Sequence, residues 1–212
     1  MSPMSTPSFQ IRVCQNPSCG LRYPLTLDHP FGERCPLCLG ETVVAFEQTI
    51  EREPVREDDD LFKTNLRVVL DNVRSAWNVG AIFRTADGFG IHHLYLCGIT
   101  PTPDNESVTK TSLGAEEFVT WSAHKNALKL VKGLQAEGWK IWALEKTDGS
   151  KSLAEKIKLP KETILVVGNE VSGVDPGILE VADKIFHIPM RGQKRSFNVA
   201  IAFAVAVSRI QI

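Results

Sequence analysis

A short stretch near the C-terminus, residues 188–199, combines polar, basic and backbone groups that could bind an anion or a cofactor. An apolar strand is expected to end at Pro189, and a basic loop that contains a glycine then leads into a helix beginning at Ser196 or Asn198. The first N–H groups of a helix lack partners within it, so they can bind a ligand beside such a loop. The alternative is an ordinary strand-to-helix turn capped by Ser196. The cations of the loop are Arg191, Lys194 and Arg195.

Two further polar groups are expected where strands end. Asn78 and Arg84 follow one apolar strand, and Glu170 lies between two glycines in residues 168–173, after another. Ligands of parallel α/β sheets bind at the carboxyl ends of the strands. Singly, Arg84 could be an ordinary surface arginine and Glu170 a carboxylate at a helix N-terminus. The sequence contains neither G-x-G-x-x-G nor G-x-x-x-x-G-K-[ST], which argues against a Rossmann dinucleotide site and a P-loop.

Four of the five cysteines fall in two pairs, each in a short turn rich in glycine and proline. Two thiolates on each of two turns suit a tetrahedral Zn²⁺ site with four sulfur ligands. Two disulfides are the alternative, but a C-x-x-C pair and a cytoplasmic location disfavour them. His29 lies between the pairs and could replace one thiolate, whereas Cys97 is expected to be a buried core thiol. The expected zinc ligands are Cys14, Cys19, Cys35 and Cys38.

The charge distribution separates a small acidic part of the chain from a larger, mildly basic part. Residues 1–60 contain 5 Lys and Arg against 10 Asp and Glu, and residues 61–212 contain 19 against 15. The net charge of −1 for the whole chain therefore says little about its partners. We expect a zinc-ribbon-like domain at residues 1–48, which needs its metal to fold, an acidic linker at residues 49–62 and a main domain at residues 63–212.

The overall composition, 43% hydrophobic and 23% charged residues, is typical of a soluble globular protein. No apolar run reaches the length that spans a membrane. The N-terminus has neither the charged nor the apolar region of a secretory signal. We therefore expect a cytoplasmic protein without a membrane partner.

The main domain alternates apolar segments with amphipathic ones, which predicts an α/β fold with a parallel sheet covered on both faces. The last helix is apolar on nearly every side, so it must be buried in the domain or against another subunit. Strands are expected at residues 66–70, 94–97, 140–144, 163–167 and 184–188. Helices are expected at residues 78–90, 124–137 and 198–210, with short ones near Leu153 and Asp175 and a proline-rich loop at residues 99–106.

Taken together, three ordered motifs in residues 78–86, 168–173 and 188–199 resemble those of the TrmH/SpoU family. They read Asn-Val-Gly-Ala-Ile-Phe-Arg-Thr-Ala, Gly-Asn-Glu-Val-Ser-Gly and Ile-Pro-Met-Arg-Gly-Gln-Lys-Arg-Ser-Phe-Asn-Val. The family comprises RNA ribose 2′-O-methyltransferases of the SPOUT superfamily, and the resemblance covers about residues 65–212. It implies a SPOUT-type parallel sheet with a C-terminal deep trefoil knot, bound S-adenosylmethionine, and a homodimer whose active site combines residues of both subunits. The N-terminal zinc ribbon is not typical of the family.

The resemblance also implies roles for particular residues. Arg84 matches the proposed base of the family, but an arginine normally stays charged. We expect Arg84 to hold the adjacent phosphate and to stabilise the developing alkoxide. Asn78, Glu170, Ser196 and Asn198 would orient Arg84, the cofactor and the ribose. Backbone contacts to the cofactor are expected around Leu144, Gly168, Ile188, Met190 and Phe197, although most family members carry leucine at the position of Phe197. RNA phosphates are expected to contact Lys110, Arg191, Lys194 and Arg195, whose alternative role is that of solvated surface residues.

The expected activity is methyl transfer from S-adenosylmethionine to a ribose 2′-hydroxyl of transfer or ribosomal RNA, with a slight preference for transfer RNA. Two other functions are compatible with the same motifs. One is an RNA-binding protein that keeps the knot but does not methylate, against which the intact motif residues argue. The other is a zinc-ribbon adaptor for protein partners, in which the knotted domain serves as a scaffold.

Overall fold

The computed structural model describes residues 8–26, 33–49, 64–160 and 162–211. The chain divides into two compact units, residues 1–58 and residues 59–212. Apart from residue 49, the expected acidic linker lies outside the described residues, and so does His29.

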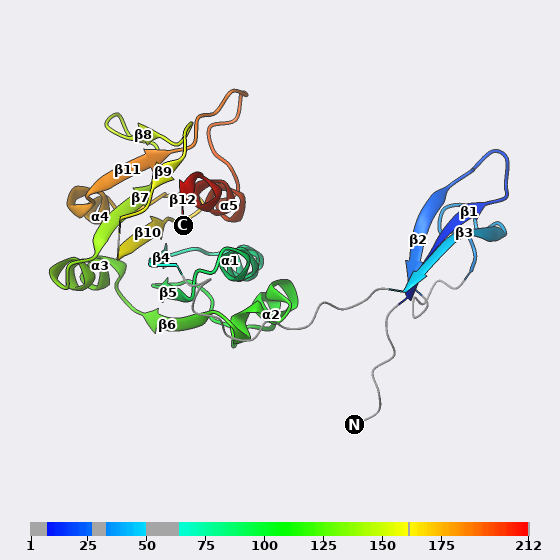
Figure 1. The fold of residues 1–212 in the computed structure, drawn as a ribbon, viewed down its shortest axis with the longest axis horizontal. Helices are drawn as coiled ribbons and strands as arrows, with labels where there is room; N and C mark the ends of the chain where they lie inside the picture. Colours follow the sequence, from blue (N-terminus) through cyan, green and yellow to red (C-terminus); the bar gives the residue numbers. More distant parts are fainter. Residues whose placement is uncertain (1–7, 27–32, 50–63, 161, 212) are drawn as a thin grey trace. The chain divides into compact units, whose positions relative to one another are not determined.

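The N-terminal unit contains a three-stranded antiparallel sheet (Figure 1). Its strands are β1 (Ser8–Cys14), β2 (Arg22–Thr26) and β3 (Thr42–Thr49), and β1 lies between the other two. Most of β3 is exposed, including Val43, Val44 and Phe46. So small a sheet buries little apolar area, and it stays a prediction that this unit needs a metal to fold.

The main unit contains a seven-stranded sheet in which every pair is parallel. The strand order is β6-β5-β4-β10-β7-β11-β8, and β4, β7 and β10 are nearly continuous apolar runs, as expected for strands buried on both faces. The strands are β4 (Leu66–Asp71), β5 (His93–Cys97), β6 (Thr120–His124), β7 (Lys140–Leu144), β8 (Lys151–Ser152), β10 (Thr163–Val167) and β11 (Lys184–His187). Two short strands, β9 (Ile157–Lys158) and β12 (Ile210–Gln211), pair separately.

Helices cover both faces of this sheet, which confirms the expected α/β architecture (Figure 1). On one side lie α1 (Ala76–Gly88), α2 (Glu106–Ser112) and α5 (Val199–Arg209), and on the other lie α3 (Ala127–Ala136) and α4 (Pro176–Val181). A 3₁₀ turn, η2 (Ala115–Glu117), follows α2. The side of α1 and α5 contains the larger apolar core, around Phe83, Trp142 and Phe203. Cys97 is fully buried on the α3 side, as expected.

Close contact between α1 and α2 depends on Gly80. A Cβ atom at this position would lie 2.5 Å from the carbonyl oxygen of Val108 in α2, so any larger residue would force the two helices apart. The glycine of the first motif therefore has a packing role. It allows α2 to support the helix that carries Asn78.

The structure corrects several sequence-based expectations. No helix forms near Leu153; instead β8 pairs with β11, and the N–H of Leu153 donates to the carbonyl oxygen of His187 over 2.9 Å. Strand pairing and burial of the Leu153 side chain override its local helix preference. The sequence also did not predict α2, η2 or β6, and the expected helix at residues 124–137 begins only at Ala127, after β6 has ended at His124.

Candidate functional site

Three motif residues from distant parts of the chain form one hydrogen-bonded group. The side-chain amide of Asn198 donates to Oδ1 of Asn78 over 2.9 Å, and the amide of Asn78 donates to Oε1 of Glu170 over 2.9 Å. We call these three residues the Asn–Glu–Asn group. They come from the first turn of α1, the loop after β10 and the start of α5. The structure thus unites one residue from each motif.

Helix capping fixes how the amides of this group are oriented. Oδ1 of Asn198 accepts from the N–H groups of Ala200 and Ile201, so Asn198 and not Ser196 is the N-cap of α5. The amide nitrogen of Asn198 is then left to face Asn78, which must present its oxygen to Asn198 and its nitrogen to Glu170. Only one arrangement of donors and acceptors satisfies the group.

The carboxylate of Glu170 receives donors from the turn that opens α1. Its two oxygens accept from the N–H groups of Arg74 and Ser75 over 2.9 and 3.0 Å, in addition to the amide of Asn78. Partial burial opposes ionisation, but the donors of Arg74, Asn78 and Ser75 prevail and lower the pKa of Glu170. Glu170 is therefore a fixed negative charge at neutral pH. It ties the motif 168–173 to α1.

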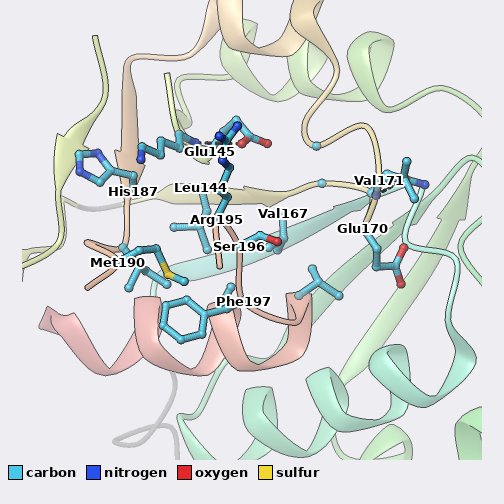
Figure 2. A pocket seen from close by; sticks show the side chains of 17 residues that line it. Leu144, Glu145, Val167, Glu170, Val171, His187, Met190, Arg195, Ser196 and Phe197 are labelled. Carbon is cyan, nitrogen blue, oxygen red and sulfur yellow. Dashed lines mark hydrogen bonds between the residues drawn. The ribbon is translucent and has the colours of Figure 1, made fainter. Parts of the chain in front are cut away.

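A cavity of about 240 Å³ lies beside the Asn–Glu–Asn group, at the carboxyl ends of β7, β10 and β11. Figure 2 shows Met190 and Phe197 at one side of this cavity and Glu170 at the other, with Leu144, Val167 and Ser196 between them. All five residues expected around the cofactor line it: Leu144, Gly168, Ile188, Met190 and Phe197. Of the residues expected at the catalytic centre, Glu170 and Ser196 line it as well.

Glu145, which the sequence analysis missed, holds one wall of this cavity in place. Its carboxylate accepts from the N–H of Val174 over 3.0 Å and from the N–H of Lys146 over 2.9 Å. A Cβ atom on Gly173, whose φ is +74°, would lie 2.2 Å from Oε2 of Glu145. The glycine therefore permits both the backbone turn and the close approach of the carboxylate. The only sequence signal was the position of Glu145 directly after the strand that ends at Leu144.

Residues at the end of β4 also hold the loop between β10 and α4 in place through hydrogen bonds. The side-chain amide of Asn169 donates to the carbonyl oxygen of Asn72 over 2.6 Å, and Oδ2 of Asp71 accepts from the N–H of Asp175 over 2.8 Å. Burial raises the pKa of Asp71, although the donors of Asp175 and Asn72 oppose this. Strand β4 and the loop that carries Glu170 thus form one connected structure.

The structure does not bring all expected site residues together. Arg84 is exposed on α1, and the described lining of the cavity does not include it. Because Arg84 follows Asn78 by six positions, the two side chains leave the helix roughly 120° apart and about 9 Å apart along its axis. Lys110 lies on α2 in a surface ion pair with Glu106 at 2.9 Å. Arg191, Lys194 and Arg195 are exposed on the loop before α5, and Arg195 also lines the cavity.

The four paired cysteines converge in the N-terminal unit. Their sulfur atoms all lie within 4.8 Å of one another, with 3.4 Å between Cys14 and Cys38 and 3.8 Å between Cys19 and Cys35. Tetrahedral Zn–S bonds of about 2.3 Å require sulfur atoms roughly 3.8 Å apart, so the cluster has the dimensions of a zinc site. Each of these two distances joins a cysteine of one sequence pair to a cysteine of the other pair, as an ion shared by both pairs requires.

Comparison with known proteins agrees with the motifs and the cavity. The sequence model of the SpoU rRNA Methylase family matches residues 65–208, which is more than half of the chain. The chain belongs to the SpoU rRNA methylase family. The fold and the site of this chain can therefore be compared with those of other members of the family.

Two SpoU-family relatives illustrate the range of substrates. The tRNA (guanosine(18)-2′-O)-methyltransferase of Aquifex aeolicus is 32% identical over 170 residues, which are 79% of this chain and 78% of that protein. The 23S rRNA (guanosine(2553)-2′-O)-methyltransferase RlmP of Bacillus subtilis is 30% identical over 68% of this chain and 57% of its own length. The chain thus spans little more than half of some relatives.

Solved structures show the same SpoU fold. The crystal structure of the A. aeolicus TrmH/SpoU tRNA modifying enzyme has a TM-score of 0.62 at 32% identity, over 69% of this chain and 74% of that one. An rRNA methyltransferase from Sinorhizobium meliloti with bound AdoMet has a TM-score of 0.63 at 26% identity, over 68% of this chain and 54% of that one. Among the residues that our structure describes, no helix is long and apolar enough to cross a membrane.

Proposed function

We propose that this SpoU-family protein transfers a methyl group from S-adenosylmethionine to a ribose 2′-hydroxyl of transfer or ribosomal RNA. The observation that carries the proposal is the Asn–Glu–Asn group beside the cavity at the carboxyl edge of the sheet. The named relatives act on both classes of RNA. Transfer RNA remains our slight preference, and a cytoplasmic location remains a prediction.

The lining of the cavity suits S-adenosylmethionine, in which a flat aromatic adenine and a ribose are joined through a sulfonium to a charged amino acid. Apolar side chains of Leu144, Ile188, Met190 and Phe197 form part of the wall, and ionisable side chains of Glu145, Lys146 and Arg195 form another part. The cofactor supplies an activated methyl group when it is bound. The chain itself supplies the pocket, and its motif loops are held by the hydrogen bonds of Glu145 and Asn169.

The ribose hydroxyl is a weak nucleophile and must lose its proton as the methyl group transfers. The chain offers two kinds of help. Ser196 and the remaining acceptors of Glu170 can hold the ribose, while Arg84 can hold the adjacent phosphate and stabilise the developing alkoxide. The phosphate then accepts the proton, and Arg84 keeps its own charge.

The direction of Arg84 supports a homodimer. Within one chain, Arg84 leaves α1 about 120° around the helix and about 9 Å along its axis from Asn78, and the described lining of the cavity does not include it. A second copy would supply it, which agrees with the partial exposure of α5, where Ile201 is 53% exposed. A C-terminal trefoil knot remains part of this proposal, because the family resemblance implies it.

We also infer that the four clustered cysteines hold a structural zinc ion. The sulfur spacing fits tetrahedral coordination, and the N-terminal unit is too small to fold on apolar burial alone. Two thiolates come from each of two turns. The ion would hold these two turns together and thereby fix how the strands of the N-terminal sheet are aligned.

The test of the activity is transfer of an isotope-labelled methyl group from S-adenosylmethionine to separate pools of unmodified transfer and ribosomal RNA, followed by nucleoside analysis. Label in a 2′-O-methylribonucleoside is the expected result, and the labelled pool identifies the RNA class. Cofactor binding without any label in either pool would contradict the proposal and favour a non-catalytic RNA-binding protein.

A further inference from the structure

Each member of the Asn–Glu–Asn group has an exposed apolar neighbour in the chain. Trp77 precedes Asn78 and is 64% exposed, Val171 follows Glu170 and is 79% exposed, and Phe197 precedes Asn198 and is 43% exposed. Large apolar side chains that surround a polar centre in solvent mark a binding surface. The three side chains are therefore part of the surface with which the site binds its ligands, and not part of the hydrophobic core.

Two of these three neighbours are accounted for by the cofactor cavity. Val171 and Phe197 line that cavity, whereas its described lining does not include Trp77. Trp77 is a large aromatic side chain next to the site that lies outside the cavity. The cofactor cavity therefore does not account for the exposure of Trp77.

The turn that carries Trp77 is held rigidly. The N–H groups of Arg74 and Ser75 donate to Glu170, and Ser75 accepts from the N–H of Asn78 as the N-cap of α1. The following helix packs on α2 through Gly80. The backbone that carries the aromatic ring therefore has little freedom to lose when a ligand stacks on the ring.

The turn beside this ring carries an exposed cation as well as the carboxylate of Glu170. Arg74 is exposed and lies three positions before Trp77, at the start of the same turn. An exposed cation beside an exposed aromatic ring is typical of surfaces that bind single-stranded nucleic acid, in which the cation meets the phosphate and the ring meets a base.

We propose that Trp77 stacks on the base of an unpaired nucleotide in the substrate RNA, with Arg74 at its phosphate. This proposal rests on the proposed function. Bases within a duplex already stack on both faces, so a protein ring can reach only a base that lies outside a helix. The enzyme would therefore select its target in a loop or another unpaired segment, and Trp77 would hold the nucleotide whose ribose meets the Asn–Glu–Asn group.

The experiment compares the full chain with the Trp77→Ala and Trp77→Phe variants, with Phe118→Ala as a matched control. Phe118 is another exposed aromatic residue, 59% exposed, and lies after α2 and η2. The probe is the unmodified transcript that the wild-type chain methylates. Dissociation constants for this RNA and for S-adenosylmethionine are measured for each variant, and sedimentation gives its oligomeric state.

We expect Trp77→Ala to raise the dissociation constant for RNA about five- to a hundredfold, as removal of one base-stacking ring does. Cofactor affinity and oligomeric state should stay at the wild-type values, and Trp77→Phe should recover most of the RNA affinity. Phe118→Ala should bind RNA like the wild type. Once the methylated nucleotide is known, an RNA with an abasic ribose there should bind wild type and Trp77→Ala equally.

Two results would overturn the proposal. Unchanged RNA affinity in Trp77→Ala would show that the ring does not contact the RNA. Dissociation of that variant into monomers would assign the ring to the interface with a second copy. Failure of the proposed function is distinguishable, because in that case the wild-type chain itself would methylate no RNA.

Discussion

The side-chain amide of Asn198 donates to the side-chain oxygen of Asn78 over 2.9 Å, although 120 positions separate the two residues in the chain. The same Asn198 caps α5, so one side chain both starts the last helix and joins it to the first motif. This double role makes the two functions separable by substitution.

The Asn198→Asp variant should lose turnover while remaining folded. Aspartate keeps an oxygen for the N–H groups of Ala200 and Ile201 and is as good an N-cap as asparagine, so the free energy of unfolding should change by less than about 1 kcal/mol. The second oxygen of the aspartate would face Oδ1 of Asn78, and both atoms are acceptors. If the Asn78 amide flipped to donate to the aspartate, its own oxygen would face the carboxylate of Glu170. We expect kcat to fall at least about tenfold, since charged and neutral acceptors would oppose each other. Asn198→Ala, which also loses the cap, is the control for stability. Wild-type turnover in Asn198→Asp would show that the group is not needed.

The Arg84→Ala variant should lose turnover and keep cofactor binding, because Arg84 lies outside the cavity. If two copies share each site, mixing Arg84→Ala with Asn78→Ala should restore activity to about a quarter of the wild-type value. Half of the randomly formed dimers would be mixed, and each would contain one intact site. Methyl transfer is measured before and after subunit exchange. No recovery despite demonstrated exchange would place Arg84 and Asn78 in the same site.

Removal of the Glu145 carboxylate should loosen the wall of the cofactor cavity. Glu145→Ala frees the N–H of Val174, and we expect the dissociation constant of S-adenosylmethionine to rise about tenfold, as loss of a charge-assisted hydrogen bond predicts. Glu145→Gln keeps one acceptor and should recover part of the affinity. Calorimetric titration measures both variants, and Asp148→Asn on the following exposed turn is the control. Equal affinity in Glu145→Ala and wild type would contradict this role.

Removal of zinc should unfold the N-terminal unit and leave the main unit intact. The purified chain should contain about one zinc ion, since four thiolates make one complete site. A chelator, or the Cys14→Ser and Cys38→Ser substitutions, should make residues 1–58 sensitive to protease while the thermal unfolding of the main unit persists. Metal analysis and limited proteolysis give the readout. Retention of a protease-resistant ribbon without metal would favour disulfides or a self-sufficient fold.

The sequence alone determined the kind of fold and identified the motif residues Asn78, Glu170 and Asn198, which meet in one hydrogen-bonded group. Apolar runs such as Leu66–Leu70 and Thr163–Val167 predicted buried strands, because burial on both faces leaves few polar positions in them. The four cysteines could be found by their spacing, and the three motifs by their resemblance to those of the TrmH/SpoU family. The sequence could not predict the short strand at Lys151–Ser152 or the helix at Glu106–Ser112, because such short elements depend on packing partners far away in the chain.

Only the tertiary structure decided how these parts meet. The sheet order places β10 between β4 and β7, and this order brings Glu170 to the turn that opens α1. Parallel pairing requires long crossovers, so the partner of each strand is not encoded in its local sequence. The same packing turned Glu145 toward Val174 and left Trp77 and Arg84 exposed on α1. Residue types therefore determined the chemistry that is possible here, and long-range packing determined which side chains can act together.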